Sequence, residues 1–350
     1  MSDRTGDGLG RFLTETWGTP VAVDRLAAAT TGARRDNVLF DARHDGDRLG
    51  LVATIIPTTG IQLMDVGDEA SMLRLAEAGG VPVPHVHAVC HDPSYVGGPF
   101  FVTSRVEGDT IPRQVLRLVE ATPGLGPTLG RQIGDALARL HAVDAGGVPD
   151  GVPRPAGGSS AAHELARVEA LLGELLQPSP PFRLACRWLA RNLPAVSPTA
   201  TVVHSDCRNG NIVVGPDGLR AILDWEGSHL GDPMEDVAWM CVRMWRFRND
   251  RLEAGGFATR ADLAAGYRDA GGTWDGDAFA WWKVLGTVRW GLGLAGQARA
   301  HLDGSFRSIV MAASGRRVAE LEYDALMLLR GAYGAAAEAP WRAAPEARTY

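Results

Sequence analysis

Short apolar runs separated by turn residues dominate the first hundred positions of the chain. Runs at 38–40, 49–57, 86–89 and 100–106 have the length and the flanking Gly, Asp or Pro residues that are typical of strands. Between them, residues 69–78 place apolar side chains at helical spacing and stop at Gly79-Gly80, which predicts a helix. An amphipathic stretch lies within 9–30. We therefore expect several short strands and one helix before residue 107.

Longer stretches with helical periodicity dominate the rest of the chain. They predict helices at 129–143, 162–176, 182–193, 236–247, 261–270, 277–300 and 310–336. The Gly- and Pro-rich segment 146–160 predicts a loop. Among the helices, three short apolar runs at 202–203, 212–214 and 218–223 predict strands, and Gly215-Pro216-Asp217-Gly218 predicts the turn between the last two.

The polar residues that separate these three runs have the spacing of a phosphoryl-transfer site. Asp206 follows His204 by two positions, Asn211 follows Asp206 by five, and Asp224 ends the next apolar run 13 positions later. Kinases place a catalytic base and two metal ligands at this spacing. A strand, loop, strand, turn and strand would hold the three side chains close together.

Each of these residue types suits the chemistry. A carboxylate such as Asp206 can accept the proton of an attacking hydroxyl. The amide oxygen of Asn211 and the carboxylate of Asp224 are the oxygen ligands that Mg²⁺ prefers. We expect His204 to brace the loop backbone, whereas Arg208 either neutralises the transferred phosphoryl group or forms a surface salt bridge. The expected catalytic residues are thus Asp206, His204 and Arg208.

Together with flanking segments, these residues resemble the aminoglycoside phosphotransferase and choline kinase-like family, especially its branch similar to the kinase-like domains of acyl-CoA dehydrogenases. The flanking segments are Val81-Pro82-Val83-Pro84, His91-Asp92-Pro93, Gly98-Pro99-Phe100-Phe101-Val102, Arg105-Val106-Glu107-Gly108, Leu137-Ala138-Arg139-Leu140-His141 and Gly231-Asp232-Pro233-Met234-Glu235-Asp236-Val237-Ala238-Trp239. The resemblance runs from about residue 25 to about residue 300. It implies an α+β, bilobal protein-kinase-like fold, with a small, mainly β N-lobe at 1–105 and a larger, mainly α C-lobe at 106–350.

The resemblance also implies how a nucleotide is held. ATP or GTP would be the phosphoryl donor, with Mg²⁺ as the metal. A covering loop at 30–36 contains Gly32 and Arg34, and a hinge at 103–107 contains Ser104 and Val106. On the sequence alone, an ordinary hairpin and a plain edge strand explain these two segments equally well.

One position departs from the family pattern. The fold normally carries a Lys or Arg on the third strand, which grips the nucleotide phosphates and pairs with a helix Glu. Glu69 fits the helix position, but the strand position is occupied by Thr54. Arg34, Arg35 or Arg48 could supply the missing charge. Otherwise the nucleotide lacks a charge-assisted clamp.

Glu226, His229 and Asp232 follow the metal-ligand position. Glu226 and His229 could face the acceptor or the metal, and a solvated loop explains both equally well. Asp232 is expected to bond the backbone of the catalytic loop, and a helix N-cap is compatible with that role.

Composition narrows the possible partners. The net charge of −6 argues against nucleic acid as the main partner, because phosphate backbones require a basic face. The four cysteines form no Cys-x-x-Cys pair, so a metal knuckle or redox motif is not expected. With no apolar N-terminal core and no run of about 18 apolar residues, we expect a cytoplasmic protein without a membrane span. As partners we expect a nucleotide and a small-molecule acceptor, bound by a monomer or homodimer.

The predicted function is a small-molecule phosphotransferase that moves the γ-phosphoryl group of ATP or GTP to a substrate hydroxyl. The absent strand cation motivates an alternative, a catalytically degenerate kinase-like binding protein in a metabolic or biosynthetic assembly. A third possibility is another reaction that uses Asp206 as a base without a phosphoryl donor. Carboxylates that could line a pocket for a polycationic acceptor are interleaved with Arg and leave the acceptor open. They are Asp262, Asp275, Asp277, Glu320, Glu322 and Asp324.

Overall fold

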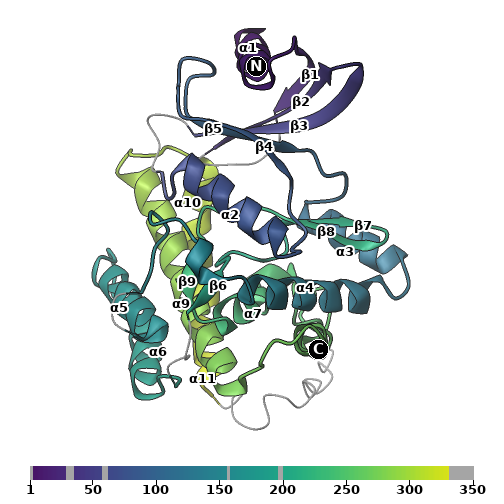
Figure 1. The fold of residues 1–350 in the computed structure, drawn as a ribbon. Helices are drawn as coiled ribbons and strands as arrows, with labels where there is room; N and C mark the ends of the chain where they lie inside the picture. Colours follow the sequence, from purple (N-terminus) through teal and green to yellow (C-terminus); the bar gives the residue numbers. More distant parts are fainter. Residues whose placement is uncertain (1–2, 29–34, 57–61, 156–157, 196–199, 331–350) are drawn as a thin grey trace.

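The computed structural model of the 350-residue chain describes residues 3–28, 35–56, 62–155, 158–195 and 200–330. A five-stranded antiparallel sheet forms the first part of the fold, in the order β1-β2-β3-β5-β4. Its strands are β1 (Ala22–Ala28), β2 (Asp36–His44), β3 (Asp47–Ile55), β4 (Val86–Cys90) and β5 (Phe100–Ser104). Figure 1 shows α1 (Asp3–Trp17) on the outer side of this sheet and α2 (Val66–Ala78) on the side of the helical lobe.

Strand alternation decides which side chains face α1 and which face the other lobe. Val38 and Phe40 of β2 and Ala53 of β3 pack with Leu9 and Leu13 of α1 in one buried cluster. Because neighbouring side chains on a strand point to opposite faces, the residues between them face away from α1. The sheet therefore presents a second, inward face toward the catalytic segment.

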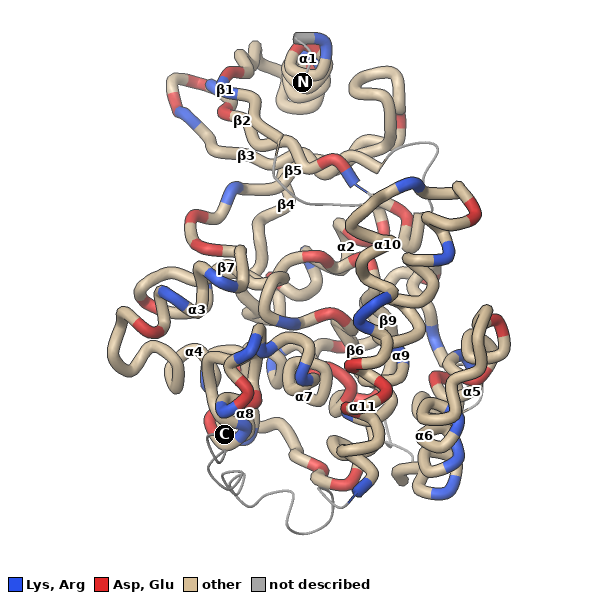
Figure 2. The backbone as a smooth tube through the Cα atoms, turned by 180° about the vertical axis from the view of Figure 1, so that it is seen from behind, with Lys and Arg blue, Asp and Glu red and all other residues tan. Residues whose placement is uncertain are grey.

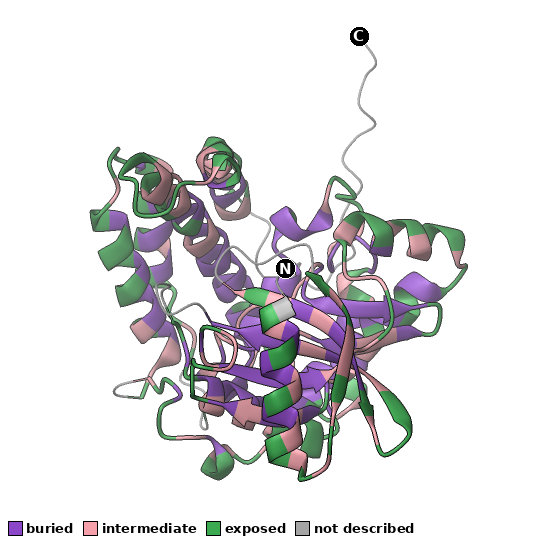
Figure 3. Ribbon diagram, turned by 90° about the horizontal axis from the view of Figure 1, so that it is seen from above, coloured by how far each residue is buried: buried purple, intermediate pink, exposed green. Residues whose placement is uncertain are grey.

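The second part of the fold is mainly helical. Its helices are α3 (Pro112–Ala121), α4 (Leu125–His141), α5 (Ser160–Gly173), α6 (Pro180–Arg191), α7 (Met234–Met240), α8 (Arg260–Asp269), α9 (Gly276–Leu302), α10 (Ile309–Ser314) and α11 (Val318–Leu329). Two small antiparallel sheets lie among them: β6 (Thr201–Val203) pairs with β9 (His229–Gly231), and β7 (Ile212–Gly215) pairs with β8 (Gly218–Ile222). Figure 3 shows that the outer helices combine buried and exposed faces, as amphipathic helices do.

Four helix predictions differ from the structure. Two helices, α1 and α2, precede residue 107, where only one was expected. The helix expected at 236–247 ends at Met240, because Val242 is extended before a 3₁₀ turn at Arg243–Arg246. The described part of 310–336 is divided by a second 3₁₀ turn at Gly315–Arg317. Helix α3 was not predicted; Pro112 starts it, and only Val115 on it is buried.

Two tryptophans of α9 and the cysteine of the catalytic loop belong to the core. Trp281 and Trp282 are 1% and 2% exposed, as expected for core residues. Cys207, inside the catalytic loop, is fully buried, and burial raises the pKa of its thiol well above the usual range. Cys207 therefore stays a neutral, small hydrophobic group rather than a reactive thiolate.

Candidate active site

The catalytic segment consists of the β7–β8 hairpin and the neighbouring pair of strands β6 and β9. Asp206 and Asn211 lie in the loop between β6 and β7, and Asp224 follows β8. Nδ2 of Asn211 lies 2.6 Å from Oδ2 of Asp206 and 3.4 Å from Oδ2 of Asp224. Asp224 has a φ of 68°, an uncommon backbone conformation for a residue other than Gly. The structure thus brings together the three side chains that the sequence spacing singled out.

Two donors hold the other oxygen of Asp206. Oδ1 accepts hydrogen bonds from Nε of Arg208 at 2.9 Å and from Nε1 of Trp239 at 2.8 Å. The guanidinium of Arg208 also stacks on the ring of Trp245, 4.5 Å from its centroid. The sequence gives no local signal of this role for Trp239, because the contact with Asp206 spans 33 positions.

His204 braces the loop from inside. The ring is fully buried and packs edge-on against Trp225. Its Nδ1 accepts from the backbone N–H of Asp206 at 3.2 Å, and its Nε2 lies 3.0 Å from the carbonyl oxygen of Leu223. An N–H can only donate and a carbonyl can only accept, so these partners require a neutral ring protonated on Nε2. Burial lowers the pKa of His204, which favours the same form.

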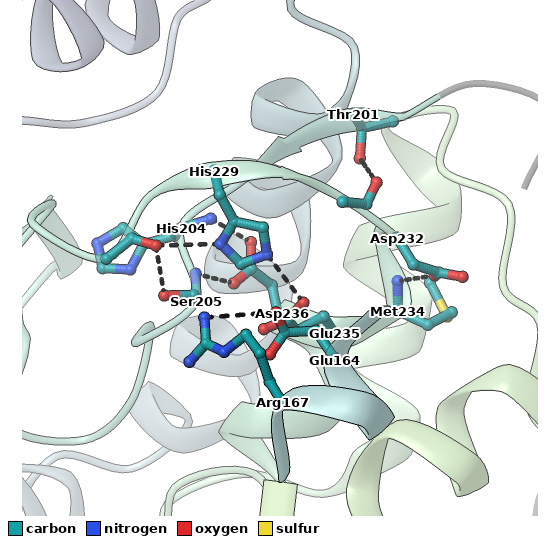
Figure 4. Close-up of polar contacts among 12 residues, drawn as sticks. Glu164, Arg167, Thr201, His204, Ser205, His229, Asp232, Met234, Glu235 and Asp236 are labelled. Carbon is teal, nitrogen blue, oxygen red and sulfur yellow. Dashed lines mark hydrogen bonds and ion pairs between the residues drawn. The ribbon is translucent and has the colours of Figure 1, made fainter. Parts of the chain in front are cut away.

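Asp236, rather than Asp232, holds the backbone of the catalytic loop (Figure 4). The fully buried carboxylate of Asp236 accepts from the backbone N–H of His204 at 2.8 Å and of Ser205 at 2.7 Å. It also contacts Nε2 of His141 at 3.1 Å. Asp232 instead accepts from the N–H of Met234 at 2.8 Å, at the start of α7. The prediction that Asp232 bonds the backbone of the catalytic loop was wrong, because Asp236, four residues further along the chain, makes these bonds.

The surroundings of Asp224 fit a divalent cation. Burial and the neighbouring carboxylates of Glu226, Asp206 and Glu69 raise the pKa of Asp224 to about 7, although Arg35 opposes them. Such crowding of buried negative charge is costly unless a cation offsets it. Asn211 and Asp224 supply the oxygen donors that Mg²⁺ prefers. These two residues are the pair that would hold the metal.

The structure shows how Glu69 is paired although the expected position on β3, Thr54, is uncharged. Nη1 of Arg35 donates to Oε1 of Glu69 at 2.8 Å, and Nη2 lies 2.5 Å from Oε2 of Glu226. Thr54 donates through its hydroxyl to Oδ1 of Asn37 at 2.9 Å. Arg48 pairs with Asp41 instead. Gly32 and Arg34, the other residues expected near the nucleotide, lie outside the described residues.

The expected hinge is the segment that joins β5 to α3. The backbone N–H of Ser104 donates to the carbonyl of His85 at 2.9 Å, and its hydroxyl lies 2.8 Å from Nε2 of His87. Val106 is half-buried next to Arg105, whose guanidinium contacts Asp41 at 2.9 Å. The start of this segment is therefore held to β4 through Ser104 and to Asp41 of β2 through Arg105.

A buried charge network lies behind the loop (Figure 4). His229 Nε2 contacts Glu235 at 3.2 Å, as Figure 4 shows. Nη1 of Arg289 lies 2.5 Å from the same carboxylate. Arg289 also donates to the carbonyl of Ser205 at 3.1 Å and stacks on Trp239. Although burial opposes protonation, Glu235 raises the pKa of His229 to about 9. Glu226 and His229, whose surroundings the sequence left open, are thus both paired.

This network predicts a stability that depends on pH. A folded-state pKa of about 9, above the ordinary 6.5, means that His229 stabilises the fold below about pH 6.5 and loses that contribution as pH rises toward 9. We expect urea denaturation of the wild type to show a loss on the order of 2 kcal/mol across this range, and His229→Gln to show a smaller loss. His91→Gln, at an exposed histidine, is the control. Equal slopes for wild type and His229→Gln would refute the assignment.

The fold and the converging acidic residues define a kinase-like phosphotransferase. The model of the phosphotransferase enzyme family (APH) matches residues 26–281, and the chain belongs to this family.

Three proteins illustrate what the chain is similar to in sequence and in fold. Acyl-CoA dehydrogenase family member 10 of Mus musculus is 32% identical over 185 residues, which cover 49% of this chain and 16% of that protein. A Ralstonia eutropha protein classed as an aminoglycoside phosphotransferase has a TM-score of 0.69 at 21% identity, covering 92% of this chain and 97% of its own. A thermostable mutant of aminoglycoside phosphotransferase APH(4)-Ia, in complex with AMP-PNP and hygromycin B, has a TM-score of 0.62 at 16% identity, covering 93% and 99%.

These likenesses confirm the α+β, bilobal kinase-like fold and the family resemblance. The matched part of the mouse relative is less than a fifth of its length. Among the residues that the structure describes, no helix is long and apolar enough to cross a membrane.

Proposed function

We propose that the protein is a small-molecule kinase that transfers the γ-phosphoryl group of ATP or GTP to the hydroxyl of an alcohol. The observation that carries this proposal is the convergence of Asp206, Asn211 and Asp224 within hydrogen-bonding distance. Asp206 is the proposed general base, and Asn211 and Asp224 are the proposed holders of Mg²⁺. When bound, Mg²⁺ would offset negative charge on the phosphates.

The residues around Asp206 suit a positioned base. Trp239 and Arg208 both donate to Oδ1, which fixes the plane of the carboxylate. Oδ2 is bonded to Asn211 and is directed toward the side of Asp224. A substrate hydroxyl that displaces one of these contacts could pass its proton to Asp206 as it attacks. Arg208 would then be free to interact with the oxygens of the transferred group.

Local charge favours a neutral or anionic alcohol as the acceptor over a polycation. Next to Asp206 lie two arginines, Arg208 and Arg289, and the nearby carboxylate of Glu235 is already paired with Arg289. The acidic residues considered for a polycation pocket are engaged elsewhere. Asp262, Asp275 and Asp277 lie at the starts of helices. Glu320 and Asp324 pair with arginines, and Glu322 accepts a hydrogen bond from Ser179. Figure 2 shows blue and red segments interspersed along the helical lobe. Faster turnover of an aminoglycoside than of hydroxy acids would contradict this choice.

The competing function is a binding protein of kinase-like fold that performs no turnover. The observation in its favour is the uncharged Thr54 on β3. The ion pair between Arg35 and Glu69 weakens this support, because the carboxylate on α2 has a cationic partner. The two functions differ in one outcome, Mg²⁺-dependent release of ADP or GDP.

The first experiment is calorimetric titration of ATP and GTP into the wild type and into Asp224→Asn, with Mg²⁺ and with EDTA. We expect binding by the wild type that requires Mg²⁺, and an affinity about ten- to a hundredfold lower in the variant, because one metal ligand is replaced by a neutral amide. Asp217→Asn, an exposed aspartate on the β7–β8 turn, is the matched control. If neither nucleotide binds at millimolar concentration, the kinase proposal fails.

A further inference from the structure

The inward face of the sheet lacks a cation at the expected strand position but has one at another. Asn37 pairs in register with Thr54, and Asp36 pairs with Ile55. Side-chain alternation along β2 puts Arg35 and Asn37 on the face opposite Val38 and Phe40, which pack toward α1. Arg35 therefore lies immediately before β2, on the same inward face as Thr54 on the neighbouring strand.

Arg35 makes the contact that the strand cation would make. Its side chain is only 10% exposed, and it bonds the 2%-exposed carboxylate of Glu69 on α2. Although burial works against it, Glu69, Glu226 and Asp224 raise the pKa of Arg35, so its positive charge is secure. Oε2 of Glu69 has no hydrogen-bond partner among the described residues, so Arg35 pairs with this acid through Oε1 alone. Burial raises the pKa of Glu69, and Arg35 works in the opposite direction.

The second arm of the guanidinium reaches the metal side of the site. Nη2 of Arg35 lies 2.5 Å from Oε2 of Glu226, two residues after Asp224. The side chain of Glu226 is 19% exposed, whereas that of Glu69 is 2% exposed. One arm is thus fixed to a buried helix and the other contacts a more accessible carboxylate. A planar fork of this kind binds phosphate oxygens well.

We propose that Arg35, at the start of the second strand, replaces the missing third-strand cation: it orders Glu69 and grips the phosphates of the nucleotide. The arm now on Glu226 is the one that exchanges a carboxylate for phosphate oxygens, while the arm on Glu69 keeps α2 in place. This inference rests on the proposed kinase function. It adds that the binding charge has moved from one strand to its neighbour while the pairing with the helix is retained.

Other basic residues are less suitable for this position. Arg48, on β3, is bound to the buried Asp41 at the far end of the same strand pair. Lys283 is on α9 and pairs with Glu253. Arg43 lies on β2 itself, but it is 65% exposed and pairs with Asp24. Arg43 is therefore a matched control on the same strand.

The test compares Mg²⁺-dependent binding of ATP and GTP by calorimetry in four proteins: wild type, Arg35→Met, Arg43→Met and the double variant Arg35→Met/Thr54→Lys. Loss of charge-assisted contacts should weaken binding by Arg35→Met about ten- to a hundredfold, with Arg43→Met unchanged. The double variant restores a cation to the third strand, on the face that Thr54 shares with Arg35, so it should recover most of the affinity. Thermal melting of each variant shows whether it is folded.

The outcomes separate this inference from the function on which it rests. If the wild type binds and Arg35→Met binds equally well, the inference is wrong while the kinase proposal stands. If Arg35→Met does not fold, the double variant decides: recovered folding and binding support the relocated cation, and folding without binding contradicts it. A wild type that binds neither nucleotide overturns both proposals.

Discussion

Replacement of Asp206 by Asn is expected to lower kcat by about a thousandfold, within the range that general-base catalysis contributes. The amide of Asn keeps an oxygen that can accept from Trp239 and Arg208. Its NH₂ group then replaces Oδ2, which accepts from Nδ2 of Asn211, so the amide of Asn211 must turn over to accept instead, and with that change the loop should keep its shape. An amide cannot accept a proton from the attacking hydroxyl. The measurement is release of ADP or GDP with water as acceptor, and then with the best alcohol of a substrate screen.

The affinity for nucleotide should change little in this variant, because Asp206 is not one of the two proposed metal holders. Calorimetry of Asp206→Asn and of the control Asp217→Asn tests this separation. A kcat within about tenfold of the wild type would exclude Asp206 as the base and leave its carboxylate a structural group. Loss of binding with unchanged kcat at saturation would instead place Asp206 on the metal.

The convergence of Asp206, Asn211 and Asp224 could be predicted because the unit that positions them is short and local. Strands at 212–214 and 218–223 and the turn between them are legible in the sequence, and a hairpin brings its two ends together whatever the rest of the chain does. Fixed spacing within such a unit therefore translates directly into proximity.

Contacts between distant segments could not be predicted in the same way. Three arginines were candidates for the missing charge, and the choice of Arg35 depends on the position of α2 beneath the sheet, 34 residues further along the chain. Similarly, Asp232 and Asp236 both flank the start of α7, and one helical turn decides which carboxylate faces the loop. Sequence patterns predict the face of a helix more reliably than the orientation of that face toward a distant loop.

The stability of the catalytic loop should depend most strongly on Asp236. Asp236→Ala would leave the buried N–H groups of His204 and Ser205 without their acceptor and remove a partner of His141. Each unsatisfied buried polar group costs about 1–3 kcal/mol, so we expect the free energy of unfolding to fall by about 3–5 kcal/mol. Ser205 has a φ of 69°, and the hydrogen bond from its backbone N–H to the carboxylate of Asp236 helps to hold this unfavourable conformation.

The matched comparison is Asp232→Ala, four residues earlier. Asp232 accepts only from the N–H of Met234 among the backbone groups of the described residues, so its loss should cost about 1 kcal/mol, as for a helix cap. Urea denaturation of both variants measures the difference. A larger loss in Asp232→Ala than in Asp236→Ala would mean that the loop is held as the sequence first suggested. The expected order instead makes Asp236 the residue through which α7 keeps Asp206 facing Asn211 and Asp224.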